Sequence, residues 1–221
     1  NLTAGNGKKN VIIPGKGRSA NITACNVFRF LNENRVSTHY LNQIGKKENS
    51  ISFEAYECLM LPLEVVVRRI ADGSYLERNP NSKKGDIFSK LIIEFFYKND
   101  ALGDPLIHID EEKWELRNPK NNDFISLIEE FFSLELFEHI KNQAKFIFLL
   151  LEKAFRNSGI ILWDLKLEFG YNMHDSFNHV SPLILADVID NDSWRITLDG
   201  VNLDKQRFRN DTANRKEILN N

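Results

Sequence analysis

The 221 residues fit one large domain or two small lobes. With 42% of them hydrophobic, including sixteen phenylalanines, they carry enough apolar surface for a sizeable core and exclude a disordered chain. The formal charge of −2 lacks the excess of Lys and Arg that sequence-independent nucleic-acid binding requires, and the longest strongly apolar run, Phe146 to Leu151, is far shorter than the roughly 20 residues that span a bilayer.

The two cysteines, Cys25 and Cys58, cannot build a disulfide framework or a four-thiolate zinc site. Two buried free thiols in a reducing compartment are the expected arrangement, which favours the cytoplasm. The chain opens at Asn1 with neither Met nor an apolar leader, so the sequence is compatible with further residues upstream.

The first predicted elements are a short strand and a helix. Val11 to Ile13 is an apolar run between two glycine-rich loops, which is typical of a strand. Asn21 can cap a helix that follows. The buried stripe of this helix recurs at three-residue spacing and consists of Ile22, Cys25, Phe28 and Leu31.

The middle of the chain predicts two strands and a helical region. Tyr56 to Ile70 contains a β-branched run in which Pro62 should sit at a strand edge or start, and Leu91 to Tyr97 is the next strand. From Asp123 to Phe155 the apolar residues fall at helical spacing, which predicts one interrupted helix or two consecutive helices.

Two further strands are predicted, at Ile160 to Phe169 and at Leu183 to Val188, joined by a polar loop. Strand and helix segments cluster along the chain rather than alternating regularly. This arrangement favours an α+β fold over a doubly wound parallel sheet.

The first of these strands alternates apolar and charged residues, so its two faces should differ. One face should be core and carry Trp163, Leu165, Leu167 and Phe169; the other should carry Asp164, Lys166 and Glu168. The same pattern also fits the solvated outer face of an antiparallel sheet, and the pattern alone leaves that alternative open.

Asp187 stands in an otherwise apolar strand, where a carboxylate needs a partner. If the two strands pair in antiparallel fashion, Glu168 and Asp187 converge on one point. Two carboxylates with waters and phosphate oxygens are the usual surroundings of Mg²⁺ in ATP-using enzymes. Lys166 between them could supply positive charge to a phosphate or a developing oxyanion.

A second group of residues suits a phosphate monoester. Arg68, Ser74 and Arg195 offer two guanidinium groups and a hydroxyl beside a glycine turn. Surface salt bridges are the ordinary alternative for either arginine. The segment from Lys98 to Pro105 reads first as a turn, and no P-loop or dinucleotide-binding fingerprint is present.

Taken in order, these segments resemble the SAICAR synthetase family, the phosphoribosylaminoimidazole-succinocarboxamide synthases of purine biosynthesis. The resemblance covers nearly the whole chain. It rests on Thr3 to Gly7, Pro62 to Arg68 with Gly73-Ser74, Lys98 to Pro105, Asp164 to Gly170, and Asp204 to Arg209.

The resemblance implies an ATP-dependent ligase that joins L-aspartate to 5-aminoimidazole-4-carboxylate ribonucleotide through an acyl phosphate. Glu168 and Asp187 would hold Mg²⁺ on ATP, with Lys98 touching the nucleotide. The residues implied to bind substrate are Arg68, Ser74, Asp104 and Arg195. Those implied to be catalytic are Asp164, Lys166, Lys205 and Arg209.

The family fold that the resemblance implies is α+β and two-lobed, with antiparallel sheets and flanking helices, and is related to ATP-grasp and kinase-like architectures. A strand-rich ATP lobe would span about residues 1–70, apparently without its first strands, and a larger substrate lobe about 71–221. A homodimer is the expected assembly. Asp72 departs from the Ala or Thr usual in the family, and Trp163 replaces a smaller aliphatic residue.

Two rival functions come from other classes. Inositol-phosphate kinases share the overall fold, but their motif has a Pro and a Gly where this chain has Ile160 and Glu168. A non-catalytic nucleotide-binding paralogue is the second rival, motivated by Asp72 beside the expected phosphate site. Binding of ATP without turnover would single it out.

Overall fold

The computed structural model describes residues 2–4, 9–11, 14–46, 51–110, 113–127, 133–174 and 182–204. Its helices are α1 (Lys16–Glu33), α2 (Ser74–Arg78) and α3 (Leu134–Arg156), with a 3₁₀ turn η1 (Asp100–Leu102). Its first strands are β1 (Leu2–Ala4), β2 (Lys9–Val11), β3 (Tyr40–Ile44), β4 (Ser52–Ala55), β5 (Cys58–Met60), β6 (Leu63–Ile70) and β7 (Ile87–Tyr97). The others are β8 (Leu106–Asp110), β9 (Lys113–Arg117), β10 (Phe124–Leu127), β11 (Ile160–Asn172), β12 (Leu183–Ala186), β13 (Trp194–Leu198) and β14 (Val201–Asn202).

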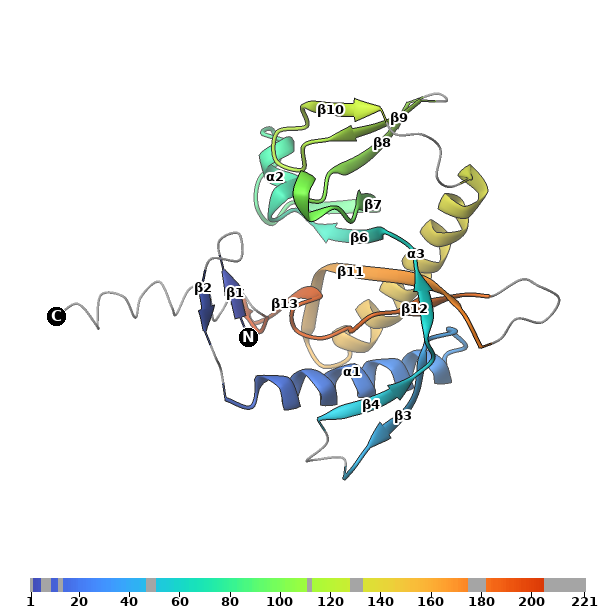
Figure 1. Ribbon diagram of the computed structural model, residues 1–221. Coiled ribbons are helices and arrows are strands. Elements are labelled where there is room, and N and C mark those ends of the chain that lie inside the picture. Colours follow the sequence, from blue (N-terminus) through green and yellow to red (C-terminus); the bar gives the residue numbers. More distant parts are fainter. Residues whose placement is uncertain are drawn as a thin grey trace.

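One large sheet organises the described residues. Its strand order is β10-β9-β8-β7-β6-β11-β13-β14, and β12 and β5 also pair with the long strand β11. All of these ladders are antiparallel. In Figure 1, β6 and β11 lie in the middle of the molecule. Strands β7 to β10 and α2 lie above them, and α1, β3 and β4 lie below. The predicted α+β class is confirmed, and the division near residue 70 stays a prediction.

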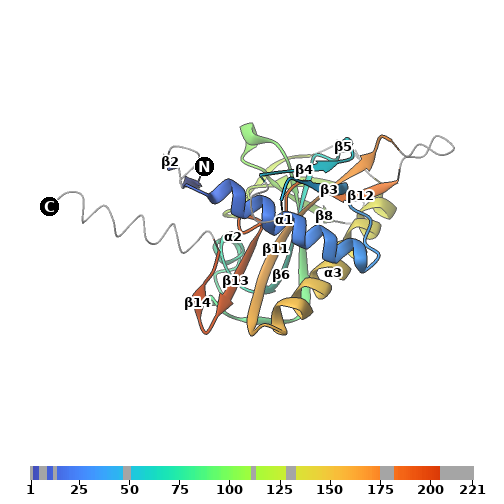
Figure 2. The ribbon, with the colours of Figure 1, turned by 90° about the horizontal axis from the view of Figure 1, so that it is seen from below.

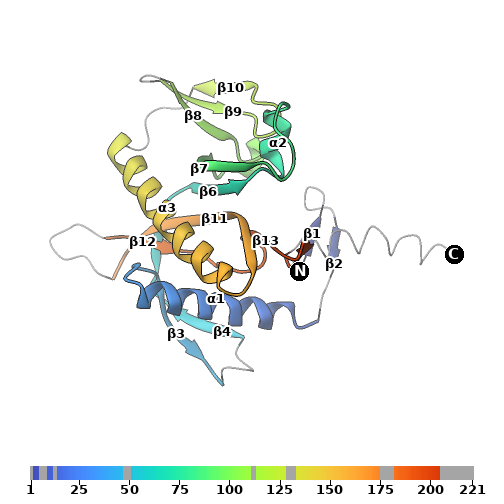
Figure 3. The same ribbon diagram turned by 180° about the vertical axis from the view of Figure 1, so that it is seen from behind.

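The helices cover the sheet and the smaller β3-β4 pair. α3 packs on β11, β6 and β7, and passes in front of β11 in the rear view of Figure 3. α1 packs on β3 and β4 and runs along the underside shown in Figure 2. Phe28 of α1 contacts Tyr40 and Phe53 through its ring, with centroids 5.9 and 6.0 Å apart. No helix in the described segments is long and apolar enough to cross a membrane.

The N-terminal expectations are partly wrong. α1 begins at Lys16, and the residue at its N-cap is Gly15 and not Asn21. Gly15 has a φ of +81°, a left-handed conformation that glycine adopts at little cost because it has no side chain. Asn21 lies within the helix and is buried. Cap preference is a weak signal when several polar residues precede an apolar stripe. β2 ends at Val11, and Ile12 and Ile13 fall outside the described residues.

The predicted helix from Asp123 is wrong in its first part. Phe124–Leu127 forms β10, which pairs with β9, and α3 begins at Leu134 with Ser133 accepting a hydrogen bond from the Leu136 amide at 3.2 Å. A short apolar run has no unambiguous period, and pairing with an open sheet edge decides its conformation.

The predicted position of Trp163 on the core face is also wrong. A β-bulge between Leu162 and Asp164 shifts the alternation of β11, so Leu162 enters the core and Trp163 is half-buried outside it. The Trp163 indole N–H donates to Thr197 Oγ1 at 3.0 Å. The strand starting after Pro62 is as expected, and the strand predicted from Leu91 begins earlier, at Ile87.

Candidate active site

The two faces of the central strands differ in chemistry. Residues directly opposite each other in an antiparallel pair share a face. Leu165 pairs with Val67 and Leu167 with Val65, and all four side chains are buried in the hydrophobic core. Asp164 pairs with Arg68 and therefore lies on the other face. The face away from the core is thus the one that carries charge.

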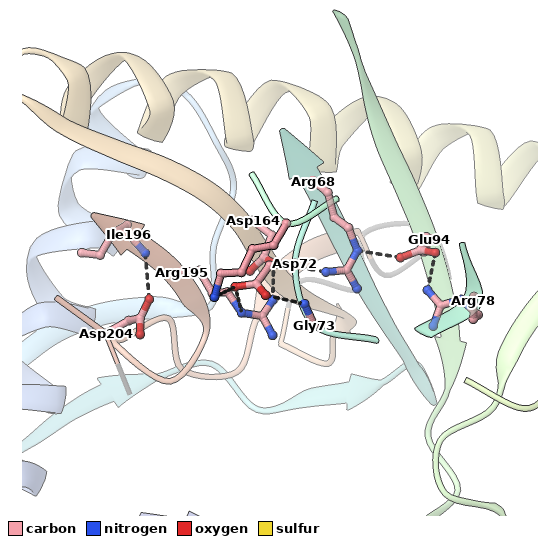
Figure 4. A network of polar contacts seen from close by, with 10 residues as sticks. Arg68, Asp72, Gly73, Arg78, Glu94, Asp164, Arg195, Ile196 and Asp204 are labelled. Carbon is pink, nitrogen blue, oxygen red and sulfur yellow. Dashed lines mark hydrogen bonds and ion pairs between the residues drawn. The ribbon is translucent and has the colours of Figure 1, made fainter. Parts of the chain in front are cut away.

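A row of alternating charges crosses four strands on this face (Figure 4). Arg68 of β6 donates from Nε to Glu94 of β7 at 2.7 Å and from Nη1 to Asp164 of β11 at 3.1 Å. Arg195 of β13 donates from Nη1 to the same Asp164 oxygen. Arg68 and Asp164 are 3% and 5% exposed, so the ion pair between them is removed from water.

Two residues extend the row at its ends. Arg78 of α2 donates from Nη2 to Glu94 at 2.5 Å, and Asp72 Oδ2 lies 3.6 Å from Arg195 Nε. Burial by itself lowers the pKa of Arg195, but the charges of Asp164 and Asp72 outweigh it and raise the pKa above its ordinary value. The guanidinium is a permanent cation.

Gly73 allows the backbone to approach Arg195. Its φ of +61° lies where L side chains are strained, and a Cβ at this position would come within 3.1 Å of Arg195 Cζ. Ser74, predicted to bind substrate, follows directly as the first residue of α2. The glycine therefore brings the start of α2 against the guanidinium.

We expect Gly73→Ala to lower the free energy of unfolding by at least about 1 kcal/mol more than Gly85→Ala does. Gly85 also has a positive φ, +94°, but no atom lies within 4 Å of a Cβ there. The Gly85→Ala control therefore also places a side chain on a residue with positive φ, but it does not displace Arg195. Chemical denaturation of both variants measures the difference, and equal losses would mean that Arg195 moves aside at no cost.

A second cluster lies further along β11. Lys166 donates from Nζ to Glu64 at 2.9 Å and to Glu168 at 2.8 Å. Lys98 donates to the other oxygen of Glu168 at 2.6 Å. Glu64 and Glu168 come from β6 and β11, and Lys98 directly follows β7. Two lysines thus enclose one buried carboxylate.

These contacts determine the charge states of the cluster. Burial by itself lowers the pKa of Lys166, but the hydrogen bond and charge of Glu168 and Glu64 outweigh it and raise the pKa above its ordinary value. Burial by itself raises the pKa of Glu168, but Lys166 and Lys98 outweigh it and lower the pKa. Lys166 is a cation and Glu168 an anion at neutral pH.

Asp187 lies beside this cluster. β12 pairs with β11 with Ala186 opposite Glu168, which confirms the predicted antiparallel pairing. Asp187 follows β12 with φ +59°. Burial and then the charge of Glu168 raise the pKa of Asp187. The carboxylates of Glu168 and Asp187 therefore interact electrostatically, as predicted, and a cation between them would reduce their repulsion.

A cavity of about 220 Å³ borders both clusters. Arg68, Asp164 and Arg195 contribute to its walls from the first cluster and Lys166 from the second. The remaining lining residues are Val66, Asp192, Ser193 and Trp194. A single small molecule in it can meet the guanidinium groups of Arg68 and Arg195 and the ammonium of Lys166.

The other predicted site residues have mixed outcomes. Asp104 accepts a hydrogen bond from the Asn99 amide at 2.9 Å within its own turn. The Lys98 to Pro105 segment is a turn, as its composition indicates, and contains η1. Lys205 and Arg209 lie outside the described residues.

Glu64 and Glu94 are site residues that the sequence interpretation missed. Each is a carboxylate within an apolar strand, in Leu63-Glu64-Val65 and in Ile93-Glu94-Phe95. This is the signal that singles out Asp187, and it applies equally to them.

Comparison with known proteins gives consistent matches. Residues 1–221 match a family model described as SAICAR synthetase. A phosphoribosylaminoimidazole-succinocarboxamide synthase of Roseiflexus sp. (strain RS-1) is 39% identical over 212 residues, which cover 95% of this chain and 76% of that protein.

Solved structures match over a similar share of the chain. A SAICAR synthetase (Type-2) in complex with ADP has a TM-score of 0.77 at 29% identity, covering 96% of this chain and 80% of that one. A phosphoribosylaminoimidazole-succinocarboxamide synthase from Ehrlichia chaffeensis has a TM-score of 0.76 at 30% identity, covering 98% and 83%.

Proposed function

We propose roles for the charged residues on the sheet face away from the core, among them Arg68, Asp164 and Lys166. The premise is that this chain belongs to the SAICAR synthetase family. The protein is accordingly an ATP-dependent ligase that joins L-aspartate to 5-aminoimidazole-4-carboxylate ribonucleotide in purine biosynthesis. The reaction needs a phosphate subsite, a metal site for ATP and a cation beside the reacting carboxylate, and each has candidate residues on this face.

The observation that carries the assignment is the cavity shared by the two clusters. Arg68 and Arg195 line this cavity and would bind the 5′-phosphate of the ribonucleotide. Ser74 follows Gly73, which lies against Arg195, and its hydroxyl would assist them. Asp164 touches both arginines and acts as a positioning residue. The carboxylate of the imidazole would then point toward Lys166, which also lines the cavity.

Mg²⁺ fits the pair formed by Glu168 and Asp187. Burial and then the charge of Glu168 raise the pKa of Asp187, and a divalent cation beside the two carboxylates would favour their charged forms. Mg²⁺ usually keeps several waters and binds through one or two carboxylates together with substrate phosphates, so two carboxylates are enough for the proposed site. When bound, the ion would neutralise charge on the phosphates of ATP, with Lys98 assisting.

Lys166 would stabilise the negative charge that develops on the reacting carboxylate. In the proposed route this carboxylate attacks the γ-phosphorus of ATP and ADP leaves, after which the aspartate amine displaces phosphate from the acyl phosphate and loses a proton. A protonated Lys166 cannot accept that proton, so it acts as a cation and not as a base.

The first test is ADP release with Mg²⁺ and ATP, measured with both acceptor substrates present and with each omitted. Release that needs both the ribonucleotide and aspartate is the expected result. Tight ATP binding with no release under any combination would instead identify a non-catalytic nucleotide-binding protein on the same scaffold.

We expect Asp187→Asn to lower turnover at least about 100-fold while the unfolding temperature of the ligand-free protein does not fall. The folded-state pKa of Asp187 is raised, so its negative charge disfavours folding at neutral pH, and this penalty disappears as the pH falls through the raised pKa. Asn also tolerates the left-handed backbone of this position.

Asp199→Asn is the matched control for this variant. Asp199 also has a positive φ, +49°, and lies in the turn between β13 and β14. It should leave turnover and its dependence on Mg²⁺ concentration unchanged. Normal activity in Asp187→Asn would remove the metal assignment.

The remaining assignments are proposals of the same kind. Asp104 would contact the amino group of the imidazole, and Lys205 and Arg209 the reacting carboxylates. A homodimer in the cytoplasm is the proposed working state. Sedimentation of the purified protein tests the assembly.

A further inference from the structure

Asp72 directs a carboxylate at the proposed phosphate site. It lies between β6 and α2, with its side chain 16% exposed. Oδ1 accepts a hydrogen bond from the Gly73 amide at 2.7 Å, which orients the carboxylate. Oδ2 lies 3.6 Å from Arg195 Nε and 3.4 Å from Lys84 Nζ. Figure 4 shows Asp72 beside the Arg195 guanidinium.

The contact between Asp72 and Arg195 is incomplete. Arg195 Nε is buried and has no hydrogen-bond partner, because 3.6 Å is too long for one. Nη1 of the same guanidinium is bonded to Asp164. One side of the guanidinium is therefore satisfied, and its other side faces an anion that does not quite reach it.

The arginines and carboxylates of this cluster balance in charge. Three arginines (Arg68, Arg78 and Arg195) face three carboxylates (Asp72, Asp164 and Glu94), and the more exposed Lys84 adds one positive charge beside Asp72. Most of the positive charge that would attract a dianion is therefore already neutralised. Asp164 and Glu94 each accept hydrogen bonds from two arginines. Asp72 contacts its arginine without a hydrogen bond, so it is the carboxylate most easily displaced.

Lys84 offers Asp72 a second position. Its side chain is 61% exposed, and its ammonium already lies 3.4 Å from Oδ2. A carboxylate that leaves Arg195 can therefore remain paired near the surface. The exchange of one anion for another on Arg195 needs no unpaired charge at either end.

We propose that Asp72 determines specificity by acting as an internal anion on Arg195. The phosphate of the bound ribonucleotide displaces the Asp72 carboxylate from Arg195, whereas free inorganic phosphate does not displace it. The proposal rests on the proposed function, because it takes Arg68 and Arg195 as the phosphate subsite. A phosphate anchored through the rest of the ribonucleotide has a high effective concentration at this subsite, whereas free phosphate must compete with a tethered carboxylate. Asp72 thereby keeps the phosphate that the reaction releases from occupying the substrate site.

Asp72→Asn tests the proposal, because it keeps an oxygen that can accept from the Gly73 amide and removes the charge. Inorganic phosphate is the probe, as an inhibitor competing with the ribonucleotide in the ADP-release assay. We expect its inhibition constant to fall at least tenfold in Asp72→Asn and in Asp72→Ala, with a smaller fall in the ribonucleotide KM. An equal inhibition constant in the folded variants and the unmodified protein would overturn the proposal.

Two further variants separate the possible failures. Asp86→Asn is the matched control, because Asp86 also lies in the segment between β6 and β7 and its Oδ2 accepts a hydrogen bond from the Lys83 amide at 2.7 Å. It removes the same charge and should not change inhibition by phosphate. Arg195→Ala should raise the ribonucleotide KM. An unchanged KM would overturn the phosphate subsite, and with it the role of Asp72, whereas a raised KM with no effect of Asp72→Asn would overturn the role of Asp72 alone.

Discussion

Lys166→Ala should lower ligase turnover at least about a thousandfold, the largest effect that we expect from a single substitution on catalysis. Lys166 borders the cavity and is held between Glu64 and Glu168 at 2.9 and 2.8 Å. In the proposed role its removal would delete the cation that stabilises the developing oxyanion, and it leaves Glu64 and Glu168 without the lysine between them. Initial rates of ADP release at saturating substrates measure the loss.

Lys166→Arg is the matched variant because it retains the charge, and we expect it to recover part of the rate. The pKa of Lys166 is raised, so its stabilising charge is fully present below the ordinary lysine pKa and is lost only as the pH rises through the higher folded value. The pH–rate profile should therefore show no deprotonation of this group below about pH 10. A folded Lys166→Ala protein that keeps more than a tenth of the rate would contradict the assigned role.

Arg68→Ala should lower the free energy of unfolding by about 3 kcal/mol, the largest expected effect on stability. The substitution removes a buried guanidinium from between Asp164 and Glu94. The loss lies at the low end for a broken buried ion pair because Asp164 keeps Arg195 and Glu94 keeps Arg78. Urea denaturation followed by circular dichroism measures it.

Arg69→Ala is the control for this prediction. Arg69 is the next residue and forms a two-point contact with Glu152 of α3, at 2.7 and 3.2 Å, but its side chain is 21% exposed. We expect a loss of about 1 kcal/mol or less. Equal losses in the two variants would mean that burial adds nothing to the Arg68 pairs. A raised ribonucleotide KM in Arg68→Ala must therefore be read together with its stability, and Arg195 is the cleaner probe of binding.

Part of the candidate active site could be predicted from local sequence because β-strand alternation places residues on faces without reference to the rest of the fold. Alternation assigns Lys166 and Glu168 to the face away from the core, and the carboxylate of Asp187 in an apolar segment indicates that it lies close to Glu168, whose register partner is Ala186. The predicted alternation of faces along β11 is wrong only at Trp163, where a β-bulge inserts one extra residue. A bulge has no reliable local sequence signal.

The fold class, the long strands and the family follow from the sequence, because each rests on local patterns and ordered motifs. Which charges meet depends instead on the tertiary structure. Arg68 and Asp164 are 96 positions apart, and Lys166 and Glu64 are 102 apart. Their pairing depends on the register of antiparallel strands that long connections bring together, and a shift of one residue would turn each side chain to the other face. The same register, through β11 and β13, brings Arg195 to the carboxylate of Asp72, a contact that neither segment encodes alone.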